Sequence, residues 1–334
     1  MGRRNAFPGK PLIRTQNDDL LRVTSVAYNS PETPPAPVHD VVIVGGGPAG
    51  LSAALILGRC RRSVLLCDSG NPRNKVSHGV NGFFTRDGAK PQDIRHIGRD
   101  DLKKYPTVQV RDIEVCDADG VDGGFEVTLA DGERHRARKL LLATGLAEDL
   151  PDIPGFRHLW GRGTYNCCYC DGWENRDRAM AVYAKGRQGV GLALEMLIWS
   201  PDVVLCTDGP ADLTPEDQDK LSRHNIRVVE TKIDHLQGES GLERIAFADG
   251  SFLECGALFY IYGEREPSHL AEKLGCELTD KGVVETRSYE RTNVPGLYAA
   301  GDASRRVQFA IIAAAEGAAA AFAINTELYK EDFQ

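Results

Sequence analysis

Long apolar runs are missing from this 334-residue sequence, in which nothing approaches the roughly 18 consecutive apolar residues of a membrane-spanning helix. Arg3 and Arg4 have no apolar segment behind them, which argues against a secretory or twin-arginine signal. A stripe of basic residues is missing as well, and the net charge is −8, so we expect neither a nucleic-acid nor a membrane partner. What remains is a chain of ordinary globular composition, long enough for two domains that each bury a core.

The sequence also lacks the cysteine pattern of a secreted disulfide framework. Six of its nine cysteines stand alone in apolar or strand-like surroundings, namely Cys60, Cys67, Cys116, Cys206, Cys255 and Cys276. Isolated cysteines of this kind are usually reduced and buried, which favours a cytoplasmic enzyme. Residues 1–38 are polar and carry four clustered prolines before the first strong strand, so we predict a flexible N-terminal extension there.

The other three cysteines fall within four positions of the stretch 165–172, YNCCYCDG. Cys167 and Cys170 form a C-x-x-C, a spacing that lets two sulfurs meet if the second cysteine begins a helix. A helix N-terminus favours thiolate over thiol, so this pair is predicted to be easily oxidised and easily attacked. A zinc or iron–sulfur site is the competing hypothesis. Because no second C-x-x-C or H-x-x-H follows nearby, we expect no metal.

A nucleotide-binding pattern follows the N-terminal stretch. Residues 40–44, DVVIV, are a continuous apolar run typical of a buried parallel strand. Gly45, Gly47 and Gly50 then form G-x-G-x-x-G ahead of a helical segment. These glycines provide the tight turn, the close approach of a pyrophosphate and the helix–strand packing of a dinucleotide site. A second strand ends at Asp68, an acid placed to bind a ribose hydroxyl.

A second unit of the same kind lies in the middle of the chain. Strand-like residues 179–183 lead into a glycine turn at 184–189 and a helix over 190–199. The turn motif Ala-Asp-Gly at 130–132 recurs 118 positions later at 248–250, so we infer two copies of one dinucleotide-binding unit.

The C-terminal part returns to the first unit. Residues 292–302 are predicted to form a strand ending in Gly301 and Asp302, and an Ala-rich helix from Phe309 is predicted to reach about Leu328. A Gly-Asp pair at a strand end, facing a helix N-terminus, can bind the phosphate and ribityl groups of a flavin.

Four motifs in this order resemble the low-molecular-weight thioredoxin reductase family: VVIVGGGPAG at 41–50, LLLATG at 140–145, CCYCDG at 167–172 and VPGLYAAGDAS at 294–304. The resemblance implies an α/β fold with two Rossmann-like dinucleotide-binding domains and β-meanders. The FAD domain would be discontinuous, formed by residues 39–154 and 285–334. An NAD(P)-binding-like domain at 155–284, carrying the C-x-x-C, would be inserted between them.

The resemblance further implies an FAD-dependent thiol–disulfide oxidoreductase, commonly a homodimer. By analogy Cys170 faces the flavin, Cys167 exchanges with a thioredoxin-like protein or a small disulfide, and Asp171 moves the proton. Cys168 is interpreted as a plain buried residue rather than an alternative disulfide partner. The implied FAD-binding residues are Gly45, Gly47, Pro48, Ala49, Gly50, Asp68, Asn81, Val115, Ala143, Thr144, Gly145, Gly301, Asp302, Gln308, Phe309 and Ala310.

The second nucleotide unit departs from the family pattern. Ala184 stands where the family has its first glycine, and a Cβ there crowds a pyrophosphate. Thr207, Asp208 and Gly209 replace the His-Arg-Arg clamp for a 2′-phosphate, so the choice between NADPH and NADH stays uncertain, and the acid favours NADH if either is used.

These departures resemble the branch that includes gliotoxin- and holomycin-type dithiol oxidases, and also relatives that take electrons from ferredoxin or a second flavin. Asp171 is closer to the reductases, because the fungal dithiol oxidase pattern has His at that position. The sequence therefore leaves the direction of electron flow open. It also leaves open a flavin-bound redox sensor without turnover.

Overall fold

The computed structural model describes residues 38–304 and 307–334, so the predicted flexible extension lies almost entirely outside the described residues. The first sheet has the order β3-β2-β1-β6-β5-β4, and β17 also pairs with β6. The pairs β2–β3, β1–β2, β1–β6 and β6–β17 are parallel, whereas β4, β5 and β6 form an antiparallel meander. Its strands are β1 (Val38–Val44), β2 (Val64–Cys67), β3 (Val108–Arg111), β4 (Val115–Val121), β5 (Gly124–Leu129), β6 (Arg134–Leu142) and β17 (Leu297–Ala299).

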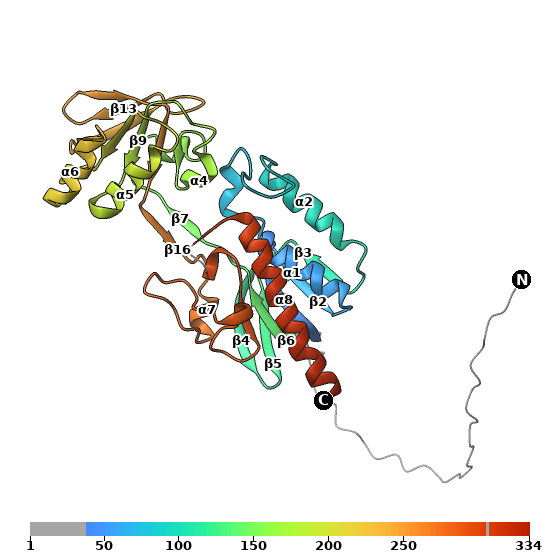
Figure 1. Cartoon of the computed structure of the whole chain (residues 1–334). Helices are drawn as coiled ribbons and strands as arrows, with labels where there is room; N and C mark the ends of the chain where they lie inside the picture. Colours follow the sequence, from blue (N-terminus) through green and yellow to red (C-terminus); the bar gives the residue numbers. More distant parts are fainter. Residues whose placement is uncertain (1–37, 305–306) are drawn as a thin grey trace, which may run out of the picture. The chain divides into compact units, whose positions relative to one another are not determined.

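Two helices from opposite ends of the chain pack together against this sheet (Figure 1). They are α1 (Pro48–Arg59), which has proline at its first position, and α8 (Ala310–Phe333). Gly317 of α8 lies so close to α1 that an added Cβ would stand 2.0 Å from the Ala49 carbonyl oxygen. The C-terminal helix therefore completes the core of the first nucleotide unit. A further helix, α2 (Pro91–Leu102), contributes Leu102 to the same core.

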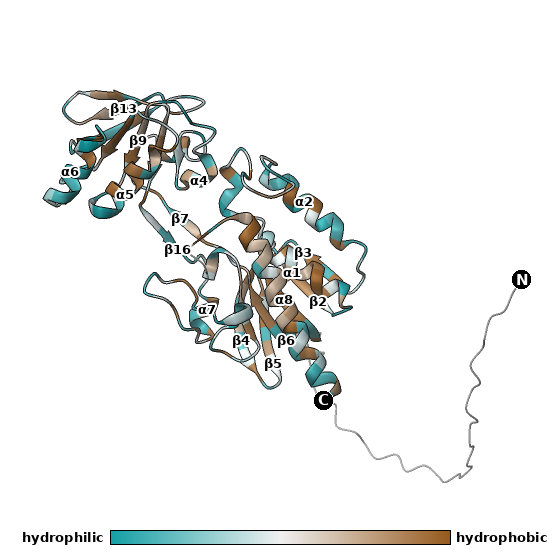
Figure 2. Cartoon of the chain, viewed as in Figure 1, coloured by the Kyte–Doolittle hydropathy of each residue, from teal (hydrophilic) through white to brown (hydrophobic). Residues whose placement is uncertain are grey.

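Helix α8 has the length and hydropathy of a membrane span, as its colouring in Figure 2 indicates, and no other helix in the described part of the chain does. Its apolar window is 44% buried, and Ala320, Ala321 and Ile324 pack in the core with α1. We interpret α8 as a core helix with one exposed apolar face.

The second half contains a five-stranded parallel sheet of order β11-β10-β9-β15-β8. Its strands are β8 (Thr164–Tyr165), β9 (Met180–Tyr183), β10 (Val203–Cys206), β11 (Arg227–Val229) and β15 (Ala257–Tyr260). The helices of this half are α3 (Phe156–Leu159), α4 (Cys168–Asp171), α5 (Gly186–Met196) and α6 (Pro215–Arg223). Helix α6 begins with a capping box between Thr214 and Asp217. Helix α5 begins four residues earlier than predicted, because the glycine-containing segment is already helical.

The predicted internal repeat is confirmed by a second antiparallel meander, formed by β12 (Ile233–Gln237), β13 (Arg244–Phe247) and β14 (Phe252–Glu254). Gly132 and Gly250, at equivalent turns, both have φ +84°, and each N–H bonds the carbonyl three residues before it. A left-handed turn position of this kind favours glycine, which explains why Asp-Gly recurs.

The two halves are joined where β7 (Ala147–Asp149) pairs antiparallel with β16 (Gly263–Arg265). Beyond β16, α7 (Leu270–Lys273) and Val284 pack in the core of the first sheet. The chain thus returns to the first core at β16, well before the predicted boundary at residue 284. Gly263 and Pro267 flank this crossing in the sequence, but Leu270 and Ala271 resemble any short apolar helix, so the pattern did not indicate which core they join. In the described part of the chain, the remaining elements are three short 3₁₀ segments: η1 (Arg73–Val76), η2 (Ser288–Glu290), which includes the left-handed Tyr289, and η3 (Asp302–Ser304).

Candidate functional site

The glycine turn between β1 and α1 builds a cradle for a dinucleotide. Gly45 has φ +109°, and an added Cβ would stand 2.2 Å from the Ala143 carbonyl oxygen. A Cβ on Gly50 would stand 1.9 Å from the Gly45 oxygen, so this glycine allows the helix to approach the strand. Gly47 differs from both because nothing lies within 4 Å of its Cβ position. The open space at Gly47, beside a helix N-terminus, is what a pyrophosphate requires.

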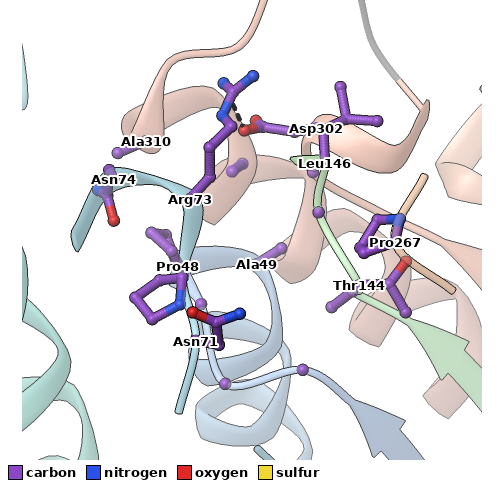
Figure 3. A pocket seen from close by; sticks show the side chains of 18 of the residues that line it. Pro48, Ala49, Asn71, Arg73, Asn74, Thr144, Leu146, Pro267, Asp302 and Ala310 are labelled. Atoms are coloured by element: carbon purple, nitrogen blue, oxygen red, sulfur yellow. Dashed lines mark ion pairs between the residues drawn. The ribbon is translucent and has the colours of Figure 1, made fainter. Parts of the chain in front are cut away.

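This turn opens into a cavity of about 330 Å³, which we call the cradle cavity (Figure 3). Twelve of the sixteen predicted FAD-binding residues line it: Gly45, Gly47, Pro48, Ala49, Asp68, Ala143, Thr144, Gly145, Gly301, Asp302, Gln308 and Ala310. The structure places the other four elsewhere. Gly50 serves packing, the Val115 side chain is buried in the core of the first sheet, and Asn81 and Phe309 line a second cavity.

Asp68, directly after β2, is the acid predicted to bind a ribose hydroxyl, and its carboxylate is already held by three hydrogen-bond donors. Arg95 and Arg99 of α2 donate to its carboxylate at 2.5 and 2.6 Å, and the Gly70 N–H donates at 3.0 Å. Burial opposes ionisation of Asp68, but these hydrogen bonds outweigh it and lower its pKa. Sequence reasoning missed both arginines, because they lie on a separate amphipathic helix.

Replacing Gly47 by Ala tests the cradle. Because the Cβ meets no protein atom, we expect the apoprotein's melting temperature to change by less than about 2 °C, whereas retained FAD falls at least about tenfold. The measurements are the flavin-to-protein absorbance ratio and a thermal melt. Gly191→Ala is the matched control, since its Cβ also meets open space but lies on α5. Full FAD content in Gly47→Ala would show that the pyrophosphate does not lie at this glycine.

The second cavity, of about 620 Å³, contains the C-x-x-C, and we call it the disulfide cavity. Cys167 and Cys170 are joined in a disulfide. Cys167 is the N-cap of α4, and its sulfur accepts from the Cys170 N–H at 3.1 Å. The expectation that the second cysteine begins the helix was wrong: the first cysteine caps it, and Cys170 lies within its single turn. The Asn81 side chain donates to the Cys170 carbonyl at 2.7 Å, which ties the disulfide to the first half of the chain.

Asp171 lines the disulfide cavity beside both cysteines. Burial, assisted by the charge of Glu174, raises the pKa of Asp171 to about 7. A carboxyl group with this pKa can both give and take a proton near neutral pH. Cys168 differs from its neighbours because it is a buried free thiol, and burial raises its pKa to about 11. It is therefore a protonated thiol, as a plain buried residue would be.

The two cavities share a charged cluster that sequence reasoning missed. Arg73 contacts Glu148 at 3.1 Å, Asp302 at 2.9 Å and the Gln308 side-chain oxygen at 2.6 Å. Arg73, Glu148 and Gln308 line both cavities. Glu148 also accepts a hydrogen bond from Asn166, the residue before Cys167, and burial raises the pKa of Glu148 to about 7. This cluster marks the place where the cradle cavity meets the disulfide cavity.

The second nucleotide unit is closed by its own loop. The first helical N–H of α5, at Gly186, would face a pyrophosphate in a dinucleotide site, but here it donates to the Ala211 carbonyl at 3.0 Å. Glu230 accepts from the Ala211 N–H at 2.7 Å, and Asp208 accepts from the Ile233 N–H at 2.6 Å. The first bond holds the loop after β10 across the start of α5, and the other two hold this loop to residues 230 and 233.

Cys167 and Cys170, the outer two of the three clustered cysteines, are joined in a disulfide. Among the residues that the structure describes, no cluster of three or more His, Cys, Asp or Glu could hold a metal ion.

Comparison with known proteins agrees with this geometry. A family model described as "Pyridine nucleotide-disulphide oxidoreductase" matches residues 39–317. The thioredoxin reductase aclD of Aspergillus oryzae is 30% identical over 306 residues, spanning 88% of this chain and 97% of that protein. A putative thioredoxin reductase TrxB from Bacillus anthracis is 35% identical with a TM-score of 0.84, covering 88% of this chain and 100% of that one. The crystal structure of HlmI is 36% identical with a TM-score of 0.83, covering 91% of this chain and 96% of that one.

Proposed function

Because the chain belongs to the pyridine nucleotide-disulphide oxidoreductase family and is an FAD-dependent thiol–disulfide oxidoreductase, we propose that electrons pass between FAD and a substrate through Cys167 and Cys170. The substrate is a thioredoxin-like protein or a small disulfide or dithiol. The observation that carries the proposal is the disulfide itself, held at the cavity that adjoins the glycine cradle.

The residues present fit FAD. The turn at Gly45, the open space at Gly47 and the N-terminus of α1 suit its pyrophosphate, while Gly301 and Asp302 lie at the end of the same cavity near α8. When bound, FAD supplies the two-electron redox chemistry. In the protein, Asn81 fixes the Cys170 backbone through its carbonyl.

In disulfide exchange, a Cys167 thiolate attacks one sulfur of the substrate disulfide and expels the other as a thiolate. Cys170 then attacks the Cys167 sulfur, which restores the protein disulfide and releases the second substrate thiol. Asp171 holds the proton that one leaving thiolate needs, and its pKa near 7 suits that task. The reverse sequence oxidises a substrate dithiol and reduces the protein pair.

Turnover of the purified flavoprotein tests this function. The full chain, assayed with NADPH, NADH and a series of dithiols and disulfides, should show thiol–disulfide exchange that Cys167→Ser abolishes. Absence of measurable exchange with every combination would leave a flavin-bound sensor as the better description.

A dithiol oxidase is the second candidate, and the covered start of α5 favours it. The Gly186–Ala211 hydrogen bond occupies the N–H that a pyridine dinucleotide would use. A small dithiol would then donate two electrons, and oxygen would accept them. Oxygen uptake driven by dithiothreitol, with no acceleration by NADPH or NADH, is the expected result. Rapid flavin reduction by either nucleotide under anaerobic conditions would count against this candidate.

We further propose a homodimer that acts in the cytoplasm without a membrane partner. Tyr289 and Phe322 are in contact, with ring centroids 5.8 Å apart and ring planes tilted by 40°, yet they are 53% and 59% exposed. A second copy covering the exposed apolar face of α8 would bury this pair. Phe322→Asp should therefore halve the mass measured by light scattering, while Phe84→Asp, at another exposed aromatic, should not. An unchanged mass in Phe322→Asp would exclude this interface.

The proposed cytoplasmic location rests on the seven free cysteines, and secretion of the full chain from its own cells would refute it.

A further inference from the structure

The described lining of the disulfide cavity carries more acids than bases. Its charged residues are Arg73, Glu148, Asp171 and Glu195. Arg73, the one cation among these described lining residues, is already paired, since it contacts Glu148 and Asp302, and Glu264 lies 3.7 Å away. Among the described lining residues, the unpaired charge is therefore negative.

Glu195, like Asp171, lines only the disulfide cavity, whereas Glu148 lines both cavities. Glu195 lies on α5 one turn after Leu192, which lines the same cavity. The Glu195 carboxylate lies close enough to the Cys168 thiol and the Tyr169 hydroxyl, the two residues between the redox cysteines, to help raise the pKa of both. Its carboxylate is thus held against the segment that carries the disulfide.

We propose that Glu195 is a specificity-determining residue that makes this cavity select neutral and cationic disulfides or dithiols over anionic ones. The inference deepens the proposed disulfide exchange and rests on it. Its physical basis is that a carboxylate in a partly enclosed cavity repels an anionic substrate more strongly than it would in water. The apolar part of the wall, with Leu192, Ile261 and Phe309, accommodates the carbon skeleton of such a molecule.

The discrimination should depend on pH with a defined sign. Burial raises the pKa of both Glu148 and Asp171 to about 7, so both are largely protonated and neutral at pH 6. Above pH 7 they ionise and add to the charge of Glu195. Arg73 from η1, Glu264 from β16 and Asp302 from η3 are the charged groups around Glu148, and Glu174 faces Asp171. Selection against anions should therefore grow between pH 6 and 8.

The test uses three linear disulfides: cystamine (a dication), 2-hydroxyethyl disulfide (neutral) and 3,3′-dithiodipropionate (a dianion). The reduced Cys167–Cys170 pair of the FAD-loaded full chain is mixed with each disulfide without oxygen, and re-formation of the pair is followed by alkylation and mass spectrometry. In each reaction two electrons and two protons pass from the cysteine pair to the disulfide, which leaves as two thiols. Rates are divided by those of free dithiothreitol with the same disulfide, because the three differ in intrinsic reactivity.

We expect the normalised rate of cystamine to exceed that of dithiodipropionate at least tenfold in the wild type. Glu195→Gln should narrow this ratio about three- to tenfold through weaker discrimination in binding, with the neutral disulfide changed less than twofold. Glu239→Gln, an exposed acid of the same half, should match the wild type. Equal wild-type rates for dication and dianion, or an unchanged ratio in Glu195→Gln, would overturn the proposal.

The order of the three exchange rates in the wild type is measured without any variant. The proposal can therefore be refuted even if Glu195→Gln does not fold. Failure of the proposed function has a different signature. If the reduced pair exchanges with the three disulfides but the enzyme shows no steady-state turnover, the proposed function is refuted. The dependence of the exchange rate on the charge of the disulfide still tests the role of Glu195.

Discussion

Replacing Asp171 by Asn is expected to slow disulfide turnover about 10²–10⁴-fold while FAD content and folding stay unchanged. The amide keeps the shape of the carboxyl group but cannot carry a proton. Asp171 lines the disulfide cavity beside both cysteines, and its raised pKa places its titration near neutrality. Steady-state rates and single-turnover exchange with one small disulfide provide the measurement.

The pH dependence separates proton transfer by Asp171 from a structural role. The group is protonated below its pKa of about 7 and ionised above it. In the direction that needs a proton donor, the wild-type rate should therefore fall above pH 7, and this inflection should be missing in Asp171→Asn. Glu174→Gln is the matched control: its charge helps to raise the pKa of Asp171, so its removal should move the inflection to lower pH with little change in the maximal rate. Wild-type rates in Asp171→Asn would remove this residue from the mechanism.

Replacing Cys167 by Ser is expected to abolish turnover and to leave Cys170 as a free thiol. If Cys170 faces the flavin, its thiolate should give a long-wavelength charge-transfer band that grows with pH. Absorbance spectra of the FAD-loaded variant between about pH 6 and 9 provide the measurement, a range that brackets an ordinary thiol pKa. Cys168→Ser is the control. Cys168 is a buried free thiol that takes no part in the disulfide, so its loss should leave most of the activity. Spectra of Cys167→Ser that do not change with pH would contradict the assignment of Cys170 as the flavin-facing cysteine.

The features predicted correctly from sequence are those encoded by neighbouring residues. The glycines at 45, 47 and 50 act through turn geometry, and the C-x-x-C acts through a spacing of three residues, so both are visible in one short stretch. The two-unit fold and the family followed from the order of such stretches, and the comparisons confirm both.

The features missed from sequence depend on contacts between distant residues. Arg73 and Asp302 are 229 positions apart and form an ion pair only because η1 and η3 meet at the cavity (Figure 3). Glu148 belongs to a three-residue strand whose polar sequence resembles an ordinary surface loop. The loss of glycine at Ala184 was visible in the sequence, whereas the Gly186–Ala211 bond across the same helix start was not. Contacts between side chains or loops that are so far apart in the sequence leave no periodic pattern in the amino-acid sequence.

The central claim is that electrons pass between the flavin and the Cys167–Cys170 pair, and an anaerobic titration of the bound flavin tests it most directly. Dithiothreitol is added stepwise to the wild type and to Cys170→Ser, with NADPH and NADH in separate titrations to identify the donor. The account predicts that the dithiol bleaches the wild-type flavin near one equivalent beyond that needed to reduce the protein disulfide, and that the flavin of Cys170→Ser stays oxidised. Equal bleaching of both proteins by the dithiol would contradict it, because the electrons would then reach the flavin without passing through the cysteine pair.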